Sequence, residues 1–151
     1  MKIYCNDSFT GITGSVKVQL FDEHGTLVQS REEHNLVVTV GKTALATWLT
    51  GAQASGFMQW IAVGFGTTSP LSGDTAMQSE TGTRVSGTLT SASNTLTNTA
   101  TFLPGNGTGA ITEFGLFSAS SSGTMFSHQV QAAYNKRAVD TLVVTWSISF
   151  N

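Results

Sequence analysis

The segment DTLVVTWSISF, residues 140–150, alternates apolar and mostly hydroxyl-bearing side chains. Successive side chains of a strand point to opposite faces of a sheet, so an alternation of period two predicts a half-buried β-strand. One face carries five apolar residues: Leu142, Val144, Trp146, Ile148 and Phe150. This segment therefore requires a sheet that has one buried face and one polar face.

Most of the chain repeats this pattern in short segments separated by turns rich in Gly, Ser and Asn. Residues 14–30 predict a hairpin, residues 31–34 a charged connector, and residues 83–102 two strands around the turn SASN. Residues 57–66, FMQWIAVGFG, are apolar enough to predict a central strand buried on both faces. We therefore predict an all-β fold, an antiparallel β-sandwich of jelly-roll type, with residues 14–151 as a single domain. Another eight-stranded sandwich has the same alternation and turns, so the pattern leaves that alternative open.

The segment NLVVTVGKTALATWLTG, residues 35–51, contains the Gly-Lys-Thr of a phosphate-binding loop. Such a loop needs a glycine five positions before the Gly-Lys pair, and Leu36 occupies that position. Residues 36–40 instead predict an apolar strand that ends at Gly41, and residues 43–49 predict one short helix with Ala44, Leu45 and Trp48 turned inward. The segment VGFGTTS, residues 63–69, likewise lacks the third glycine of a dinucleotide loop.

Charge is scarce and unevenly placed in this sequence. Charged residues make up 11% of the chain, against about 25% in a typical soluble domain. Nine of them lie in the first 42 residues, and the formal net charge is -2. Without a basic stripe the chain cannot neutralise many phosphates, so we expect no nucleic-acid partner. No apolar stretch approaches the roughly 18 residues of a membrane span, so we expect no membrane partner either.

We expect that this protein is not an enzyme and that it takes no metal and no cofactor. His24, His34 and His128 have no metal-ligand spacing, and we expect all three to be solvated. Cys5 is the only cysteine, and the nearby Asp7 would raise the pKa of its thiol, which disfavours a nucleophile.

Glu80 and Glu113 are the only glutamates after residue 42. They would form the carboxylate pair of a glycosidase if the fold brought them together. We favour a structural ion pair between Arg84 and Glu113, because Glu113 lies among apolar residues and a buried charge needs a partner.

Residues 1–13 show no clear period and are interpreted as an N-terminal arm, which could reach about 40 Å when extended. Such an arm can add a strand to the sheet edge of a neighbouring subunit. Its anchors would be the large apolar residues Ile3, Tyr4, Phe9 and Ile12, which are costly to leave in water.

Three stretches together carry a resemblance to a known group of proteins. They are residues 35–51, the stretch MQWIAVGFGTTSPLSGDTAMQSETGTR at residues 58–84, and the stretch ITEFGLFSASSSGTMFSHQV at residues 111–130. With the terminal alternating strand they resemble tailed-phage structural proteins over residues 35–151, and residues 113–117 are the most specific part. The small single-domain members are capsid decoration (cement) proteins, which are trimeric jelly rolls, and other members belong to tail fibres and tail tips.

The resemblance implies a virion structural protein, made in the host cytoplasm, that binds the major capsid protein on the outer capsid surface as a homotrimer and stabilises the shell. The alternative is a tail-associated or fibre protein that recognises a host surface glycan, for which Trp48, Trp60 and Trp146 would be the candidate residues. The loop at residues 67–79 is long for a sandwich, which favours a contact surface there. Its candidate contact residues are Thr67, Thr68, Ser69, Pro70 and Leu71.

Overall fold

The computed structural model describes residues 11–52 and 58–151. In these ranges the chain forms two antiparallel five-stranded sheets and one helix, so the prediction of an all-β sandwich is confirmed. Sheet A has the strand order β2 (Leu27–His34), β1 (Ile12–Phe21), β10 (Thr141–Phe150), β7 (Thr95–Phe102) and β6 (Thr88–Ala92). Sheet B has the order β3 (Leu36–Val37), β9 (Met125–Lys136), β8 (Gly109–Phe117), β4 (Trp60–Gly64) and β5 (Glu80–Ser86).

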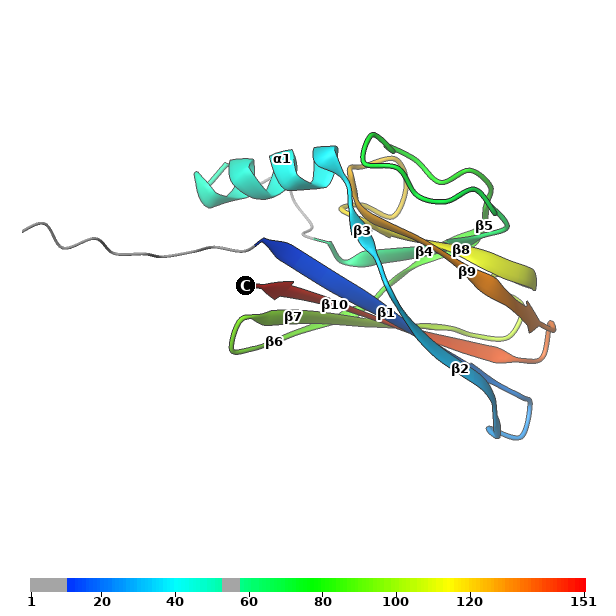
Figure 1. Ribbon diagram of the computed structural model, residues 1–151. Helices are drawn as coiled ribbons and strands as arrows, with labels where there is room; N and C mark the ends of the chain where they lie inside the picture. Colours follow the sequence, from blue (N-terminus) through cyan, green and yellow to red (C-terminus); the bar gives the residue numbers. More distant parts are fainter. Residues whose placement is uncertain (1–10, 53–57) are drawn as a thin grey trace, which may run out of the picture.

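The two sheets face each other as layers, and α1 (Thr39–Leu49) lies at the end where β1 begins and β10 ends (Figure 1). The alternating strands supply the core between the sheets. The predicted inner face of β10 is buried from Leu142 to Ile148, and Val16, Val18 and Leu20 of β1 are buried opposite sheet B. A second, smaller apolar cluster on the other face of sheet B comprises Val38, Ala62, Phe117 and Met125. Strand β4 contributes to both clusters, which confirms the prediction that this strand is buried on both faces.

Strand β1 begins earlier than predicted. The sequence predicts Ile12 as part of the arm, but Ile12 pairs with Phe150 of β10 and packs against the core. Gly14 interrupts the apolar alternation because a Cβ there would collide with the side chain of Asn35 and would come within 2.8 Å of the Ser147 carbonyl oxygen. The strand therefore continues through a position where no side chain fits. The other predicted anchors, Ile3, Tyr4 and Phe9, lie outside the described residues.

Two further boundaries differ from the prediction. Residues 31–34 are not a connector but the end of β2, where Arg31 pairs with Val18 of β1. The helix begins at Thr39 rather than at residue 43, and Gly41 is a buried helical residue, not a strand end. A Cβ at Gly41 would collide with the backbone of Phe126, so the glycine lets the helix lie directly on β9. Leu45 and Trp48 pack against the core as predicted.

Candidate functional site

The loop at residues 65–79, between β4 and β5, is tied to the sheet by one buried carboxylate. Glu113 of β8 is fully buried, and its Oε2 accepts hydrogen bonds from the Gly66 N–H at 3.1 Å and the Ser79 N–H at 3.0 Å. Its Oε1 accepts a bond from the Gln78 N–H at 2.6 Å. Because Gly66 begins the loop and residues 78 and 79 end it, Glu113 closes the loop at its base. We call this arrangement the Glu113 clamp.

A buried histidine completes the clamp. His128 of β9 is fully buried, its Nε2 lies 2.9 Å from Glu113 Oε1, and its Nδ1 lies 2.7 Å from Asp74 Oδ2 in the middle of the loop. Both ring nitrogens lie within hydrogen-bond distance of a carboxylate oxygen, so the imidazole links Glu113 of β8 to Asp74 of the loop. A histidine whose two nitrogens are occupied has no free atom to act as a general base. The cluster therefore holds the loop to β8 and β9.

Asp74 bonds to the tip of the loop in addition to its bond with His128. Its Oδ2 accepts a bond from the Leu71 N–H at 2.8 Å, and its N–H donates to the Leu71 carbonyl at 3.0 Å. Burial raises the pKa of the Asp74 carboxyl, but the bonds from Leu71 and His128 outweigh burial and leave the pKa below its ordinary value. Asp74 is therefore ionised near neutral pH and accepts the hydrogen bond from His128 Nδ1.

Glycines make room for the clamp. A Cβ at Gly66 would lie 2.5 Å from Glu113 Oε2, and a Cβ at Gly64 would collide with the Ser79 carbonyl. A Cβ at Gly115, two residues along β8 from the glutamate, would lie 2.9 Å from the sulfur of Met77. The Gly-Phe-Gly of residues 64–66 thus serves the close approach of a carboxylate and a loop.

The outer part of the loop is also bonded along its length. Gln78 and Thr68 exchange two hydrogen bonds between the glutamine side chain and the threonine backbone, at 3.0 and 3.1 Å. The Thr39 N–H, at the start of α1, donates to the Ser72 carbonyl at 2.8 Å. The predicted contact residues Thr67, Thr68, Ser69 and Leu71 are exposed, and Leu71 has 65% of its surface accessible. Pro70 is half-buried. The loop therefore presents a fixed surface with two large exposed apolar side chains, Phe65 at its start and Leu71 near its tip.

The predicted ion pair between Arg84 and Glu113 is wrong. Arg84 pairs bidentately with Glu80, at 2.7 Å from Nε and 2.9 Å from Nη2, and it lies 3.5 Å from the ring centroid of Phe117. Its Nη1 donates to the carbonyls of Ala119 and Ser122, so Arg84 holds the turn after β8. Glu113 instead faces the loop and His128. The arginine was the only cation that the sequence placed nearby, and the backbone N–H groups that satisfy Glu113 leave no signature in a sequence.

The remaining candidates are placed as follows. His24 and His34 are exposed as expected, whereas the expectation of a solvated His128 is wrong. Trp146 is buried, and Trp48 and Trp60 are half-buried against the two apolar clusters. Cys5 lies outside the described residues. Among the residues that the structure describes, no group of His, Cys, Asp and Glu is placed to hold a metal ion, and no helix is long and apolar enough to cross a membrane.

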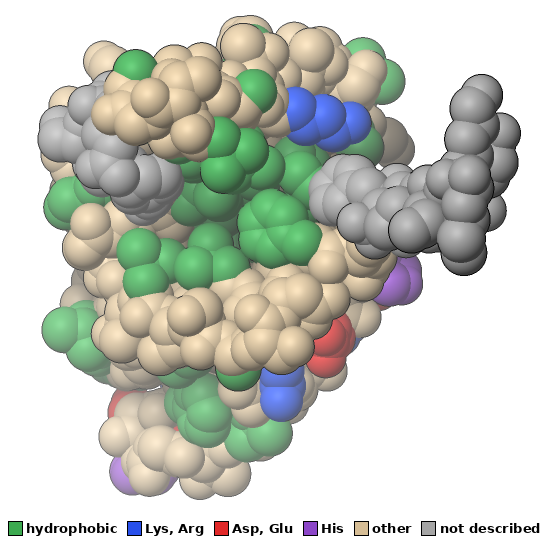
Figure 2. Space-filling model, turned by 90° about the vertical axis from the view of Figure 1, so that its left-hand side faces the viewer, with side chains coloured by type: hydrophobic (Ala, Val, Ile, Leu, Met, Phe, Trp, Pro, Cys, Tyr) green, Lys and Arg blue, Asp and Glu red, His purple; other side chains and the backbone are tan. Residues whose placement is uncertain are grey.

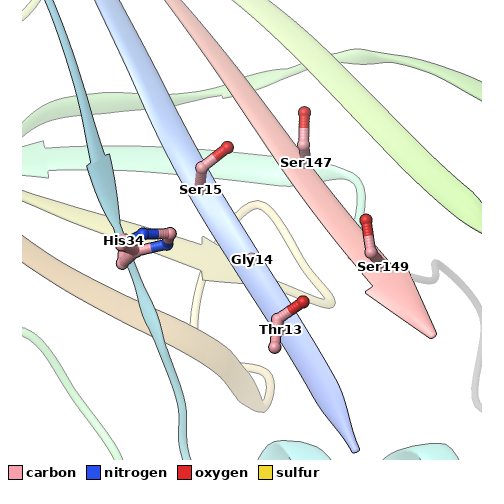
Figure 3. A pocket seen from close by; sticks show the side chains of 6 residues that line it. All are labelled: Thr13, Gly14, Ser15, His34, Ser147 and Ser149. Carbon is pink, nitrogen blue, oxygen red and sulfur yellow. The ribbon is translucent and has the colours of Figure 1, made fainter. Parts of the chain in front are cut away.

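The outer face of sheet A is lined by hydroxyl groups. Figure 3 shows Thr13 and Ser15 of β1, Ser147 and Ser149 of β10, and His34 around a hollow of about 200 Å³. The hydroxyl-bearing strands pair directly, since Thr13 lies opposite Ser149 and Ser15 opposite Ser147. The part of this face around the hollow offers hydrogen-bonding groups and carries little net charge.

Comparisons of the chain with models of known protein families, with curated proteins and with solved structures found no match.

Proposed function

We propose that this protein is a virion structural protein that binds the outer surface of a phage capsid as a homotrimer and stabilises the shell. The observation that carries the proposal is the Glu113 clamp, which fixes the loop at residues 65–79 and leaves Thr67–Leu71 on the surface. The jelly-roll topology and the place on the virion are part of the same proposal, and they rest on the resemblance of residues 35–151 to tailed-phage structural proteins, whose small single-domain members are decoration proteins.

A clamped loop is suited to binding a large rigid partner. Ordering a loop on binding costs free energy, and a loop that is already ordered avoids this cost. Here a buried carboxylate, a buried imidazole and several backbone bonds hold the loop before any partner arrives. A fixed surface can therefore match a repeating shell by shape.

The chemistry of the loop also fits a protein partner. Thr67, Thr68 and Ser69 carry hydroxyl groups, and the exposed Leu71 is a large apolar side chain that a partner can bury. Asp74, the one charged residue between residues 43 and 79, is turned toward His128. Contacts of this kind depend only weakly on salt. A ligand that binds only the assembled shell stabilises it by mass action.

Co-sedimentation with shells of the encoding virus, prepared without this protein, tests the proposal. We expect the wild-type chain to sediment with the shells and the Leu71→Asp variant to bind at least about 30-fold more weakly, which corresponds to a hot-spot residue worth about 2 kcal/mol. The matched control is Leu103→Asp, because Leu103 is 63% exposed and lies outside the loop. A wild-type chain that stays in the supernatant, or equal binding by the two variants, would overturn the proposal.

A further inference from the structure

The cluster of Glu113, His128 and Asp74 needs one more proton than a neutral histidine and two ionised carboxylates hold. The imidazole makes two contacts, each of a ring nitrogen with a carboxylate oxygen, at 2.7 Å from Nδ1 and 2.9 Å from Nε2. A nitrogen and a carboxylate oxygen attract each other at this distance only when a hydrogen lies between them. A neutral imidazole has one N–H, so the second contact requires one further proton in the cluster.

The surroundings of the three groups indicate where the further proton lies. Asp74 has a pKa below its ordinary value, so near neutral pH it is ionised and accepts the bond from Nδ1. The further proton therefore belongs to the pair of Glu113 and His128, on Oε1 or on Nε2. Both side chains of the pair are fully buried, and two buried acceptors that face each other without a hydrogen are costly.

Other titratable groups around the cluster are few. Within residues 11–52 and 58–151, β3 and β4 contain none, and α1 contains only Lys42, which is exposed. Strand β5 carries Glu80 and Arg84, which bond to each other, and Tyr134 and Lys136 lie at the far end of β9. Charged side chains are also sparse on the face of the molecule shown in Figure 2. The protonation of the cluster is therefore set mainly by its own three members.

Asp74 is the member of the cluster that can move away. Its side chain keeps 24% of its surface exposed, whereas the side chains of Glu113 and His128 are fully buried. Three backbone N–H groups also hold Glu113 in place. When the further proton is lost, the neutral imidazole can still direct one N–H at Glu113, and its Nδ1 then presents a lone pair to Asp74. The Asp74 carboxylate is repelled and exchanges this contact for water.

The tip of the loop is bonded to the same atom of Asp74. Oδ2, which faces the imidazole, also accepts the Leu71 N–H at 2.8 Å. The base of the loop is closed separately, because the N–H groups of Gly66 and Ser79 bond to Glu113. Movement of Asp74 therefore frees the tip of the loop and leaves its base closed.

We propose that this cluster is a proton-dependent switch: one proton held by Glu113 and His128 keeps the tip of the loop in place, and its loss as the pH rises frees Leu71. An unfolded chain holds histidine neutral and both carboxylates ionised above about pH 7.5. The folded state then binds one proton more than the unfolded state, so the stability that the switch contributes falls as the pH rises. Only its consequence for shell binding rests on the proposed function.

Urea unfolding of the wild type and of Asp74→Ala tests the switch between about pH 7.5 and pH 9. Alanine needs no hydrogen from Nδ1, so the variant folds without the further proton. The advantage of the wild type in the unfolding equilibrium constant should therefore shrink by about three- to tenfold per pH unit. The control is Asp22→Ala, because Asp22 accepts two backbone bonds at an exposed turn and its advantage should not change with pH. A constant ratio for Asp74→Ala would overturn the switch.

Amide hydrogen exchange of the wild type distinguishes release of the tip from opening of the whole loop. As the pH rises over the same range, the Leu71 N–H should lose protection relative to its intrinsic exchange rate at each pH. The N–H groups of Gly66 and Ser79, which bond to Glu113, should keep theirs. Equal loss at all three positions, or no loss at Leu71, would contradict the proposal.

Co-sedimentation with shells at both pH values separates the switch from the proposed function. We expect the wild type to bind more weakly at the higher pH and Asp74→Ala to bind equally weakly at both. A wild type that binds shells at neither pH would overturn the proposed function, while the unfolding and exchange measurements still decide the switch. Wild-type binding that persists when Leu71 has lost protection would show that the tip is not the shell contact.

Discussion

Replacing Glu113 with glutamine removes one acceptor from a fully buried site that receives three backbone N–H groups. These are the N–H groups of Gly66 and Ser79, which share Oε2, and the N–H of Gln78, which bonds to Oε1. An amide has one oxygen and one NH₂ group, so in either orientation at least one of the three N–H groups faces another donor. Each buried donor that loses its acceptor costs about 1 to 3 kcal/mol. We therefore expect Glu113→Gln to lower the free energy of unfolding by at least about 1 to 3 kcal/mol.

Urea unfolding followed by tryptophan fluorescence and by far-UV circular dichroism measures this loss. In a chain of this length a loss of about 1 to 3 kcal/mol lowers the Tm by roughly 2 to 12 °C. The control is Glu32→Gln, because Glu32 lies exposed on β2, where it accepts a bond from Ser15, and such surface changes stay within about 0.5 kcal/mol. If Glu113→Gln also stays within about 0.5 kcal/mol of the wild type, the carboxylate does not carry the loop and the reasoning fails.

Three further predictions concern the same cluster. Gly66→Ala places a Cβ 2.5 Å from Glu113 Oε2 and should destabilise the protein by about 1 to 3 kcal/mol in a thermal melt, whereas Gly73→Ala, with open space around its Cβ, should be close to neutral. Asp74→Asn and His128→Gln should show a coupling of about 0.5 to 3 kcal/mol in a double-mutant cycle, since they are bonded at 2.7 Å, and additive effects would contradict the contact. The folded-state pKa of Asp74 lies below the ordinary 3.8, so its stabilisation is present above pH 3.8 and is lost as the pH falls through the folded-state value. The difference in stability between wild type and Asp74→Asn should therefore shrink between pH 6 and pH 2, and a constant difference would contradict this assignment.

The alternating strands could be predicted because burial on one face imposes a period of two. β10 shows this directly, since each predicted inner residue from Leu142 to Ile148 is buried. The alternation did not predict the element boundaries at two glycines, where close packing leaves no room for a side chain. Atoms of Asn35 and Ser147 lie too close to Gly14 for a Cβ, and the backbone of Phe126 lies too close to Gly41. The strand and helix boundaries predicted at these glycines are wrong for this reason.

The clamp could be predicted only in part. The isolated Glu113 among apolar residues correctly indicated a buried charge in need of partners. Its partners could not be predicted, because backbone N–H groups are common to every residue and His128 is 15 positions away along the chain. The sequence does contain one indication of the clamp, because three glycines lie close to it: Gly64 at the end of β4, Gly66 in the loop and Gly115 in β8.

Cryo-electron microscopy of the full-length protein bound to shells prepared without it tests the central claim, which is that the clamped loop attaches this protein to a capsid. We predict density for three copies at each attachment point on the outside of the shell, with residues 67–71 against the shell surface. Shells without added density, density located at the tail, or copies that meet the shell through another face would contradict the account.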